Sequence, residues 1–454
     1  MADEMFDDRP SQEALSKCVH CGFCLQECPT YLQLGLETDS PRGRIHMIEA
    51  LTDDKISATP ALTQHLDLCL QCRACETACP SGVEFGSIME SARAMIVQSG
   101  EAPRSWKIRA WLLAALLPYP KRITALFFCL RLYQRTGLQW LLRASRVLRL
   151  LPGGLADAES MLPALPQRRF EMPNDDGSAS YARTVALLTG CVMPHLYPRT
   201  HEATVRVLRR HNIGVVAPAE QRCCGALSLH AGDRPTAREL ARGNIDVFLA
   251  SGVEAVIVNS AGCGATLKEY GELLAGDPEY AEKAVRFSSI VRDVTEFLAE
   301  LPLQPPARGV EQRVTYQDSC HLVHGQQVRS APRELLRAIP GLELVELEAP
   351  DRCCGSAGIY SFAQREMSLR LLDEKMRDVA STLKLRTGPW PDNDNAKSRT
   401  GLSPDTDNAP VIATANPGCV MQLEAGLRRH GLPGRVVHVV ELLDEAYQEQ
   451  EQSN

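Results

Sequence analysis

Short hydrophobic runs alternate with amphipathic stretches over the second half of the chain. Residues 185–190 ("VALLTG"), 213–218 ("IGVVAP") and 254–260 ("EAVIVNS") are typical of buried strands, and 201–211 ("HEATVRVLRRH") has helical spacing. The same order then returns in "QRVTYQDS", "PRELLRAI", "LELVELEA" and "PVIATANPG". The pattern therefore predicts two similar α/β units related by duplication.

Cysteines mark equivalent points of the two units. The first unit carries Cys191, Cys223, Cys224 and Cys263, and the second carries Cys320, Cys353, Cys354 and Cys419. The offsets are 129 residues for the first cysteine, 130 for the Cys-Cys-Gly motif and 156 for the last. The extra length falls in 386–409, a Pro-, Asp- and Asn-rich stretch that we expect to be a flexible surface insertion. Each cysteine follows a predicted strand, so four thiols should converge at one edge of each sheet.

Composition places the chain among ordinary soluble globular proteins. It has 454 residues, 44% hydrophobic and 23% charged, with a net charge of −7 and 17 cysteines. The acidic start, "MADEMFDDRP", lacks the features of a secretory signal, so we expect a cytoplasmic protein. In a reducing compartment these thiols favour metal or redox chemistry over disulfides. The isolated Cys129 in "ALFFCLRL" is instead expected to be inert core.

Two cysteine runs with the pattern C-x2-C-x2-C-x3-C-P lie near the start. They are "CVHCGFCLQECPTY" from Cys18 and "CLQCRACETACPSG" from Cys69, separated by helix-like stretches such as "RGRIHMIEAL". In two-cluster ferredoxins the fourth cysteine of each run reaches the other cluster. The predicted ligand sets are Cys18, Cys21, Cys24 and Cys79 for one 4Fe-4S cluster, and Cys69, Cys72, Cys75 and Cys28 for the other. A structural zinc ion is the alternative, but it takes only four ligands.

The Cys-Cys-Gly motifs indicate further metal binding. Adjacent side chains such as those of Cys223 and Cys224 point in different directions, so they suit neighbouring irons of a cluster better than one ion. Packing or a redox-active thiol pair remains an alternative for all eight cysteines of the two units. His195, His201, His321 and His324 lie near these motifs, and we expect them to have ordinary supporting or exposed roles. The same expectation holds for His20 within the first run.

Residues 102–156 contain no Asp or Glu but ten Lys and Arg. The apolar runs there are too short and too often interrupted for a transmembrane helix of about 20 residues. The segment could lie on an anionic membrane surface, or it could be a helical arm that packs on the clusters or on a partner subunit. The sequence leaves both interpretations open.

The combined motifs resemble one family over nearly the whole chain. "CVHCGFC", "CPTY", "SPRGRI", "CETACPSGV", "SAGCGATLKEYG", "CCGSAG" and "TANPGC" are similar to the iron-sulfur subunit of glycolate oxidase (glycolate dehydrogenase). This resemblance implies electron transfer from FAD-linked glycolate oxidase subunits toward an acceptor, with membrane quinone the expectation, at the inner face of the cell membrane. It implies no flavin and no catalytic residue in this chain, and nothing indicates a nucleic-acid partner.

Related subunits of D-lactate and glycerol-3-phosphate dehydrogenases share the resemblance, as do heterodisulfide reductases. In the last group the cysteine-rich unit ends C-x2-C, whereas Cys263 is followed here by "GAT" and Cys419 by "VMQ", which argues against disulfide reduction. A zinc-holding scaffold is a third hypothesis.

The expected fold class is α + α/β, with four parts. They are an α-helical ferredoxin-like domain with two 4Fe-4S clusters (1–100), a basic helical segment with a Pro/Gly-rich linker (101–180), and two cysteine-rich units (181–300 and 301–454).

Overall fold

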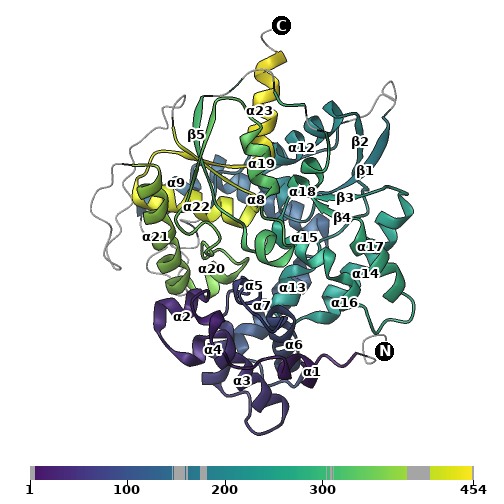
Figure 1. The fold of residues 1–454 in the computed structure, drawn as a ribbon, viewed down its shortest axis with the longest axis vertical. Coiled ribbons are helices and arrows are strands. Elements are labelled where there is room, and N and C mark those ends of the chain that lie inside the picture. The colour runs from purple at the N-terminus through teal and green to yellow at the C-terminus, as the bar shows by residue number, and fades with distance from the viewer. Residues whose placement is uncertain are drawn as a thin grey trace.

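A computed structural model shows a helical N-terminal region below two parallel β-sheets (Figure 1). It describes residues 6–145, 147, 159, 162–173, 181–302, 304–306, 309, 311–385 and 409–451. The prediction of helices followed by α/β structure with parallel sheets is confirmed at this level.

The first sheet has the order β2-β1-β3-β4, and all its neighbouring strands are parallel. Its strands are β1 (Arg183–Leu188), β2 (Ile213–Val216), β3 (Val256–Val258) and β4 (Val291–Asp293). Val185 on β1 lies opposite Val215 on β2, and Leu187 lies opposite Ile257 on β3. Three strands fall in the predicted runs; β4 was not predicted because its sequence, "VRD", contains a single apolar residue and no hydrophobic run.

The second sheet repeats this arrangement in the order β6-β5-β7-β8. Its strands are β5 (Gln312–Tyr316), β6 (Leu342–Glu346), β7 (Val411–Thr414) and β8 (Arg435–His438). In both sheets the chain adds strands first toward one edge and then toward the other. The change occurs between β1 and β3 in the first sheet and between β5 and β7 in the second. Such switch points leave a crevice at the carboxyl ends of the strands, where ligands of parallel α/β sheets bind.

The helices of the two units cover these sheets and join them. The first unit has α11 (Met193–Leu196), α12 (Pro198–Arg210), α13 (Ala226–His230), α14 (Arg234–Ala250), α15 (Ala261–Lys268), α16 (Tyr270–Leu273), α17 (Ala281–Ser289) and α18 (Val294–Ala299). The second has the π-helix η4 (His321–Gly325), α19 (Ala331–Arg337), α20 (Tyr360–Ala363), α21 (Arg365–Thr382), α22 (Pro417–His430) and α23 (Val439–Glu451). Because α12 packs on α23 and α18 on α19, Leu187 and Val314 share one buried core.

Short helices separate the cysteine runs of the N-terminal region. They are α1 (Gln12–Ser16), α2 (Pro29–Leu34), α3 (Pro41–Thr52), α4 (Pro60–Asp67), α5 (Ala74–Thr77) and α6 (Phe85–Gln98), with 3-10 turns η1 (Phe23–Leu25) and η2 (Glu37–Asp39). Local sequence defines the start of α3. The hydroxyl of Ser40 accepts a hydrogen bond from the backbone N–H of Gly43 at 3.0 Å, and Pro41 occupies the first turn. Ile48 and Met89 are then both buried in the core of this region.

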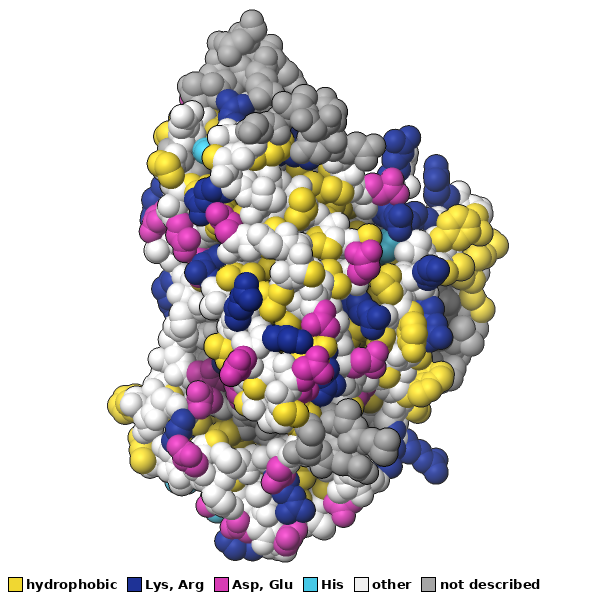
Figure 2. Space-filling model, turned by 90° about the vertical axis from the view of Figure 1, so that its right-hand side faces the viewer, with side chains coloured by type: hydrophobic (Ala, Val, Ile, Leu, Met, Phe, Trp, Pro, Cys, Tyr) yellow, Lys and Arg dark blue, Asp and Glu magenta, His cyan; other side chains and the backbone are white. Residues whose placement is uncertain are grey.

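In the part that the structure describes, the basic segment forms an arm with the helices α7 (Arg104–Leu116), α8 (Pro120–Arg135) and α9 (Leu138–Ser145). Hydrophobic side chains bordered by Lys and Arg gather at the right-hand edge of the molecule in Figure 2. Among the described residues no single helix is long and apolar enough to cross a membrane; α7 and α8 meet that criterion only as a pair bent by 101°.

Part of the expected linker packs on the first unit. Phe170 is buried in the core shared by the two units, and its N–H donates to the carbonyl of Pro194 at 2.7 Å. The rest of 151–180 lies mostly outside the described residues, as does the predicted insertion 386–409 apart from its last residue.

Candidate metal centres

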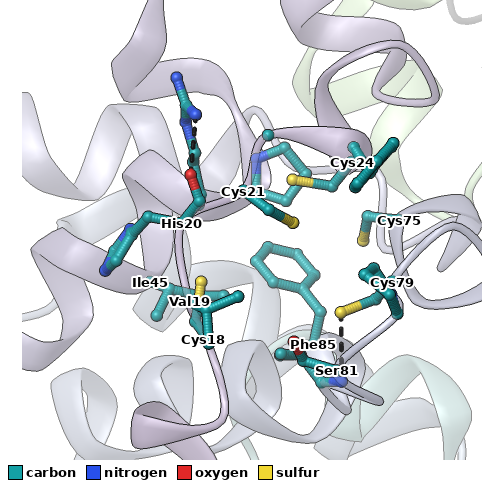
Figure 3. Close-up of a pocket in the computed structure, with 16 residues that line it drawn as sticks. Cys18, Val19, His20, Cys21, Cys24, Ile45, Cys75, Cys79, Ser81 and Phe85 are labelled. Atoms are coloured by element: carbon teal, nitrogen blue, oxygen red, sulfur yellow. Dashed lines mark hydrogen bonds between the residues drawn. The ribbon is translucent and has the colours of Figure 1, made fainter.

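Five cysteines surround one pocket in the N-terminal region. Figure 3 shows the side chains of Cys18, Cys21, Cys24, Cys75 and Cys79 around a common space, which has an empty volume of about 410 Å³ including its open side. Hydrophobic side chains such as Ile45, Val83 and Phe85 form the remaining wall. The structure therefore brings together the whole first predicted set, and it adds Cys75, which the spacing assigns to the second.

The two cysteine loops share an unusual backbone. Residues on either side of the second cysteine are left-handed in both loops: His20 and Gly22 have φ of 54° and 87°, and Gln71 and Arg73 have φ of 53° and 65°. Three of these four residues are not glycine, so the conformation is costly and must be held by the surrounding structure. In the first loop Cys18, Cys21 and Cys24 all line the one pocket.

The second predicted set is buried. Cys28, Cys69, Cys72 and Cys75 are all buried, and burial raises the pKa of Cys75, with the charges of Cys72, Cys69 and Cys28 adding to the effect. A thiolate so placed is stable only with a compensating positive group, which iron provides in a cluster. By contrast Cys21 in the first set is exposed.

A buried arginine supports Cys28, and sequence reasoning missed it. Arg44 lies 4.0 Å from the sulfur of Cys28, donates to the hydroxyl of Thr30 at 3.1 Å and pairs with buried Asp39 at 3.3 Å. The hydroxyl of Thr30 is 3.2 Å from the same sulfur. The available signal was the "SPRGRI" motif, whose last arginine is Arg44.

The four thiols of the first cysteine-rich unit meet at the carboxyl ends of its strands. The thiols of Cys191 and Cys224 lie within hydrogen-bonding reach of Cys223, and Cys224 reaches Cys263 in turn. Hydrogen bonds from Cys191 and Cys224 lower the pKa of Cys223. Gly225 follows with φ 86°, the left-handed turn that begins α13.

The four thiols of the second unit lie in the same sequence of neighbouring pairs as those of the first. Cys353 reaches Cys320 and Cys354, and Cys354 reaches Cys419. The hydrogen bond with Cys353 and burial raise the pKa of Cys354 to about 12, although Cys419 opposes this. The amide of Asn416 donates to the sulfur of Cys419 at 3.7 Å.

The second cysteine run touches the second unit directly. Cys72 belongs to the same buried cluster as Cys353, and Cys320 packs against that cluster. Burial raises the pKa of Cys72, and the charge of Cys353 adds to the effect. The structure thus places a predicted ferredoxin-type ligand beside the Cys-Cys-Gly motif of another unit.

Hydrogen bonds fix this junction. His321 lies with its Nε2 2.8 Å from the carbonyl of Gln71, and the Nδ1 of His324 lies 2.8 Å from the hydroxyl of Thr77. Arg73, between Cys72 and Cys75, pairs with Glu269 of the first unit. Both cysteine-rich units therefore hold the loop that carries the second set.

The remaining predictions have mixed outcomes. His20 is exposed; His195 is buried and stacks on Phe127 at 4.7 Å, and His201 lies 3.1 Å from the carbonyl of Thr189. The prediction for Cys129 was wrong: it is exposed on α8, because the helix turns Phe127 inward instead. Within the part of the chain that the structure describes, no three His, Cys, Asp or Glu side chains are placed to hold a single metal ion.

Comparison with known families matches this geometry. The chain matches the 4Fe-4S dicluster domain over residues 14–83, the cysteine-rich (CCG) domain over 185–268 and 314–386, and the linker region of the glycolate oxidase iron-sulfur subunit over 106–162. It is 40% identical to the probable glycolate oxidase iron-sulfur subunit of Bacillus subtilis, over 97% of this chain and 96% of the relative. The chain belongs to the family of glycolate oxidase iron-sulfur subunits.

The chain is also similar to two further relatives and to one solved structure. The glycolate oxidase iron-sulfur subunit of Escherichia coli is 34% identical over 84% of this chain and 89% of its own length. One of the subunits of the fumarate reductase (CoM/CoB) of Methanothermobacter marburgensis is 26% identical over 97% of this chain and 74% of its own. A hypothetical protein from Helicobacter pylori has a similar fold, with a TM-score of 0.55 at 8% identity, over 98% of this chain and 75% of that one. The family assignment makes this chain an iron-sulfur, electron-transfer subunit of an oxidoreductase.

Proposed function

We propose that this chain carries electrons within a complex whose FAD-linked subunits oxidise glycolate to glyoxylate. The observation that carries the proposal is that Cys72 and Cys353 share one buried cluster, against which Cys320 packs, because this places the second N-terminal set beside the cysteines of the second cysteine-rich unit. The names of the two most similar relatives cited above support glycolate as the substrate. D-Lactate and glycerol 3-phosphate are the alternatives, since that choice is made in a partner chain.

Two 4Fe-4S clusters would be held by Cys18, Cys21, Cys24 and Cys79, and by Cys69, Cys72, Cys75 and Cys28. Bound clusters supply one-electron transfer at these positions. The donor set fits them, because the thiols of the first set line one pocket and those of the second are buried together. Val19 and Phe23 are exposed beside Cys21, so the first set offers an apolar contact surface for an electron-donating partner.

The cysteine-rich units are proposed to be duplicates, each with its own metal centre. Support comes from their equal strand order and from their packing. In each unit one helix follows the first strand (α12 and α19) and another follows the last strand (α18 and α23). The former helix of each unit packs on the latter helix of the other unit. The centres would use Cys191, Cys223, Cys224 and Cys263, and Cys320, Cys353, Cys354 and Cys419. The proposed domain limits are 1–100, 101–180, 181–300 and 301–454.

The arm is proposed to rest on the inner face of the cell membrane. One side of the arm packs on the protein, because Leu113 and Leu117 lie in or against the core of the first unit. Its outer face exposes Trp111, Phe128 and Trp140 to solvent. Aromatic side chains beside Lys and Arg suit an interfacial helix at an anionic membrane, close to a lipid-soluble quinone.

Metal analysis and electron paramagnetic resonance test the cluster assignment. Anaerobically purified chain should contain iron and sulfide, show reducible 4Fe-4S signals, and oxidise no glycolate until FAD-linked subunits are added. Cys69→Ser should lose one of the two N-terminal signals, whereas the matched Cys129→Ser should keep both because Cys129 is exposed and outside every set. Zinc without iron, or glycolate oxidation by the chain alone, would overturn the proposal.

A further inference from the structure

The loops that carry the last cysteines of the two cysteine-rich units lie against each other. Cys263 is on α15, whose N-cap is Ser260. Cys419 is on α22, whose N-cap is Asn416. The hydroxyl of Ser260 donates to the Oδ1 of Asn416 at 3.2 Å, although the two residues are 156 positions apart. A backbone hydrogen bond of 3.2 Å beside this contact also joins the loops. Equivalent residues of the two units therefore meet in the folded chain.

Asn416 links the two loops through both ends of its side-chain amide. Its Oδ1 accepts the backbone N–H of Gly262 at 3.3 Å as well as the hydroxyl of Ser260. A backbone N–H can only donate, so this bond fixes the amide oxygen toward the first unit and the Nδ2 toward the second. The Nδ2 then donates to the sulfur of Cys419 at 3.7 Å. One side chain thus binds the residue before Cys263 and the thiol of Cys419.

A second donor reaches the same thiol. Ser319 directly precedes Cys320, and its hydroxyl lies within hydrogen-bonding reach of the Cys419 sulfur. The hydrogen bond with Cys354 and burial raise the pKa of Cys419, whereas the hydrogen bonds from Asn416 and Ser319 act in the opposite direction. Both donors therefore favour the charged form of this thiol, which is the form that binds a metal.

The first unit has different residues at the two equivalent positions. Ser260 stands where the second unit has Asn416, and its hydroxyl donates to that amide and not to a thiol. Gly190 directly precedes Cys191, so it stands where the second unit has Ser319, and it has no side chain. The two units thus share the arrangement of their cysteines and differ in the hydrogen bonds that these positions offer to the last one.

Hydrogen bonds to a cysteine sulfur raise the reduction potential of an iron-sulfur centre, because they stabilise the negative charge that reduction adds. We propose that Asn416, assisted by Ser319, makes the centre of the second cysteine-rich unit easier to reduce than the centre of the first. This rests on the metal centres proposed above for the two units. An electron shared by the pair then resides on the second centre: the first is oxidised by one electron, and the second is reduced by the same electron.

A potentiometric titration of the complete complex, followed by electron paramagnetic resonance, measures both centres. Cys263→Ser and Cys419→Ser should each remove one signal and so assign the signals to the units. In the wild type the signal of the second unit should appear at the higher potential. Asn416→Ser introduces the residue type of the first unit. It should shift the reduction equilibrium of the second centre about tenfold toward the oxidised state, which is about 59 mV for one electron. The shift of the first centre should be much smaller.

Asn416→Asp separates the two roles of the amide. An ionised carboxylate still accepts from Gly262 but cannot donate to Cys419, so this variant should shift the second centre at least as far as Asn416→Ser does. Asn212→Ser is the matched control, because Asn212 is exposed in the turn before β2, at the opposite end of the sheet from the cysteines. It should leave both potentials unchanged.

The possible failures can be told apart. Retention of the two N-terminal 4Fe-4S signals shows that a variant has folded. An unchanged potential of the second centre in Asn416→Ser would overturn the inference. A wild type whose first unit has the higher potential would also overturn it, and that measurement does not depend on a variant of Asn416. Iron in the wild type that the two N-terminal clusters fully account for would instead contradict the metal centres proposed for the units themselves.

Discussion

Membrane binding through the arm is open to a quantitative test. Trp111, Phe128 and Trp140 are 67%, 65% and 73% exposed. Full burial of a side chain of this size contributes about 1.5–3 kcal/mol, so each has roughly 1–2 kcal/mol still to gain in a membrane interface. Replacing all three with Ser should therefore weaken vesicle binding by about 3–6 kcal/mol, which is at least about a hundredfold.

Flotation with vesicles of phosphatidylcholine and about one-third phosphatidylglycerol measures this partition. Val285→Ser is the matched control, because Val285 is 62% exposed on α17, outside the arm. Each Lys or Arg near an anionic surface contributes about 1 kcal/mol, so Lys121→Gln should weaken binding about fivefold at low salt and much less at high salt. Equal binding to vesicles without the anionic lipid, or unchanged binding of the triple variant, would refute the reasoning and favour a protein partner for this face.

Two stability predictions follow from buried contacts. Gly355 has φ 86°, and a Cβ there would lie 2.5 Å from the carbonyl oxygen of Ser368. Gly355→Ala should therefore lower the free energy of unfolding by about 3 kcal/mol. The control Gly35→Ala, where a Cβ would meet open space, should lower it by only about 1 kcal/mol, and thermal unfolding compares the two variants. Burial acts to raise the pKa of Asp8, but hydrogen bonds and charges of Arg238 and Arg234 outweigh it and lower that pKa below its ordinary value of 3.8. This stabilisation is present at neutral pH and is lost as the pH falls through the folded-state pKa. Asp8→Asn should thus cost about 3 kcal/mol at pH 7 in urea unfolding and little in acid, and a pH-independent difference would contradict the assignment.

Local sequence was sufficient wherever a short stretch defines its own geometry. The spacing of the C-x2-C-x2-C runs identified the candidate ligands, although the surrounding structure holds the left-handed backbone of these loops. The strand before Cys191 is recognisable from its continuous apolar run, and the strand before Cys320 from its place in the repeat. The repeat of these runs also predicted the two sheets, because parallel strands need intervening helices that leave a recognisable order.

Long-range packing decided the rest. "ALFFCLRL" is apolar on every side, so its periodicity could not show that Phe127 faces the protein and Cys129 faces solvent. Nor could spacing show that Cys72 and Cys353 share one buried cluster, since that arrangement depends on how the N-terminal region docks on a unit formed almost 300 residues later. The sequence by itself determined which residues can hold metal and which segments form strands, because those properties depend on neighbours along the chain. Only the tertiary structure decided which sites adjoin and which faces stay exposed, because those properties depend on neighbours in space.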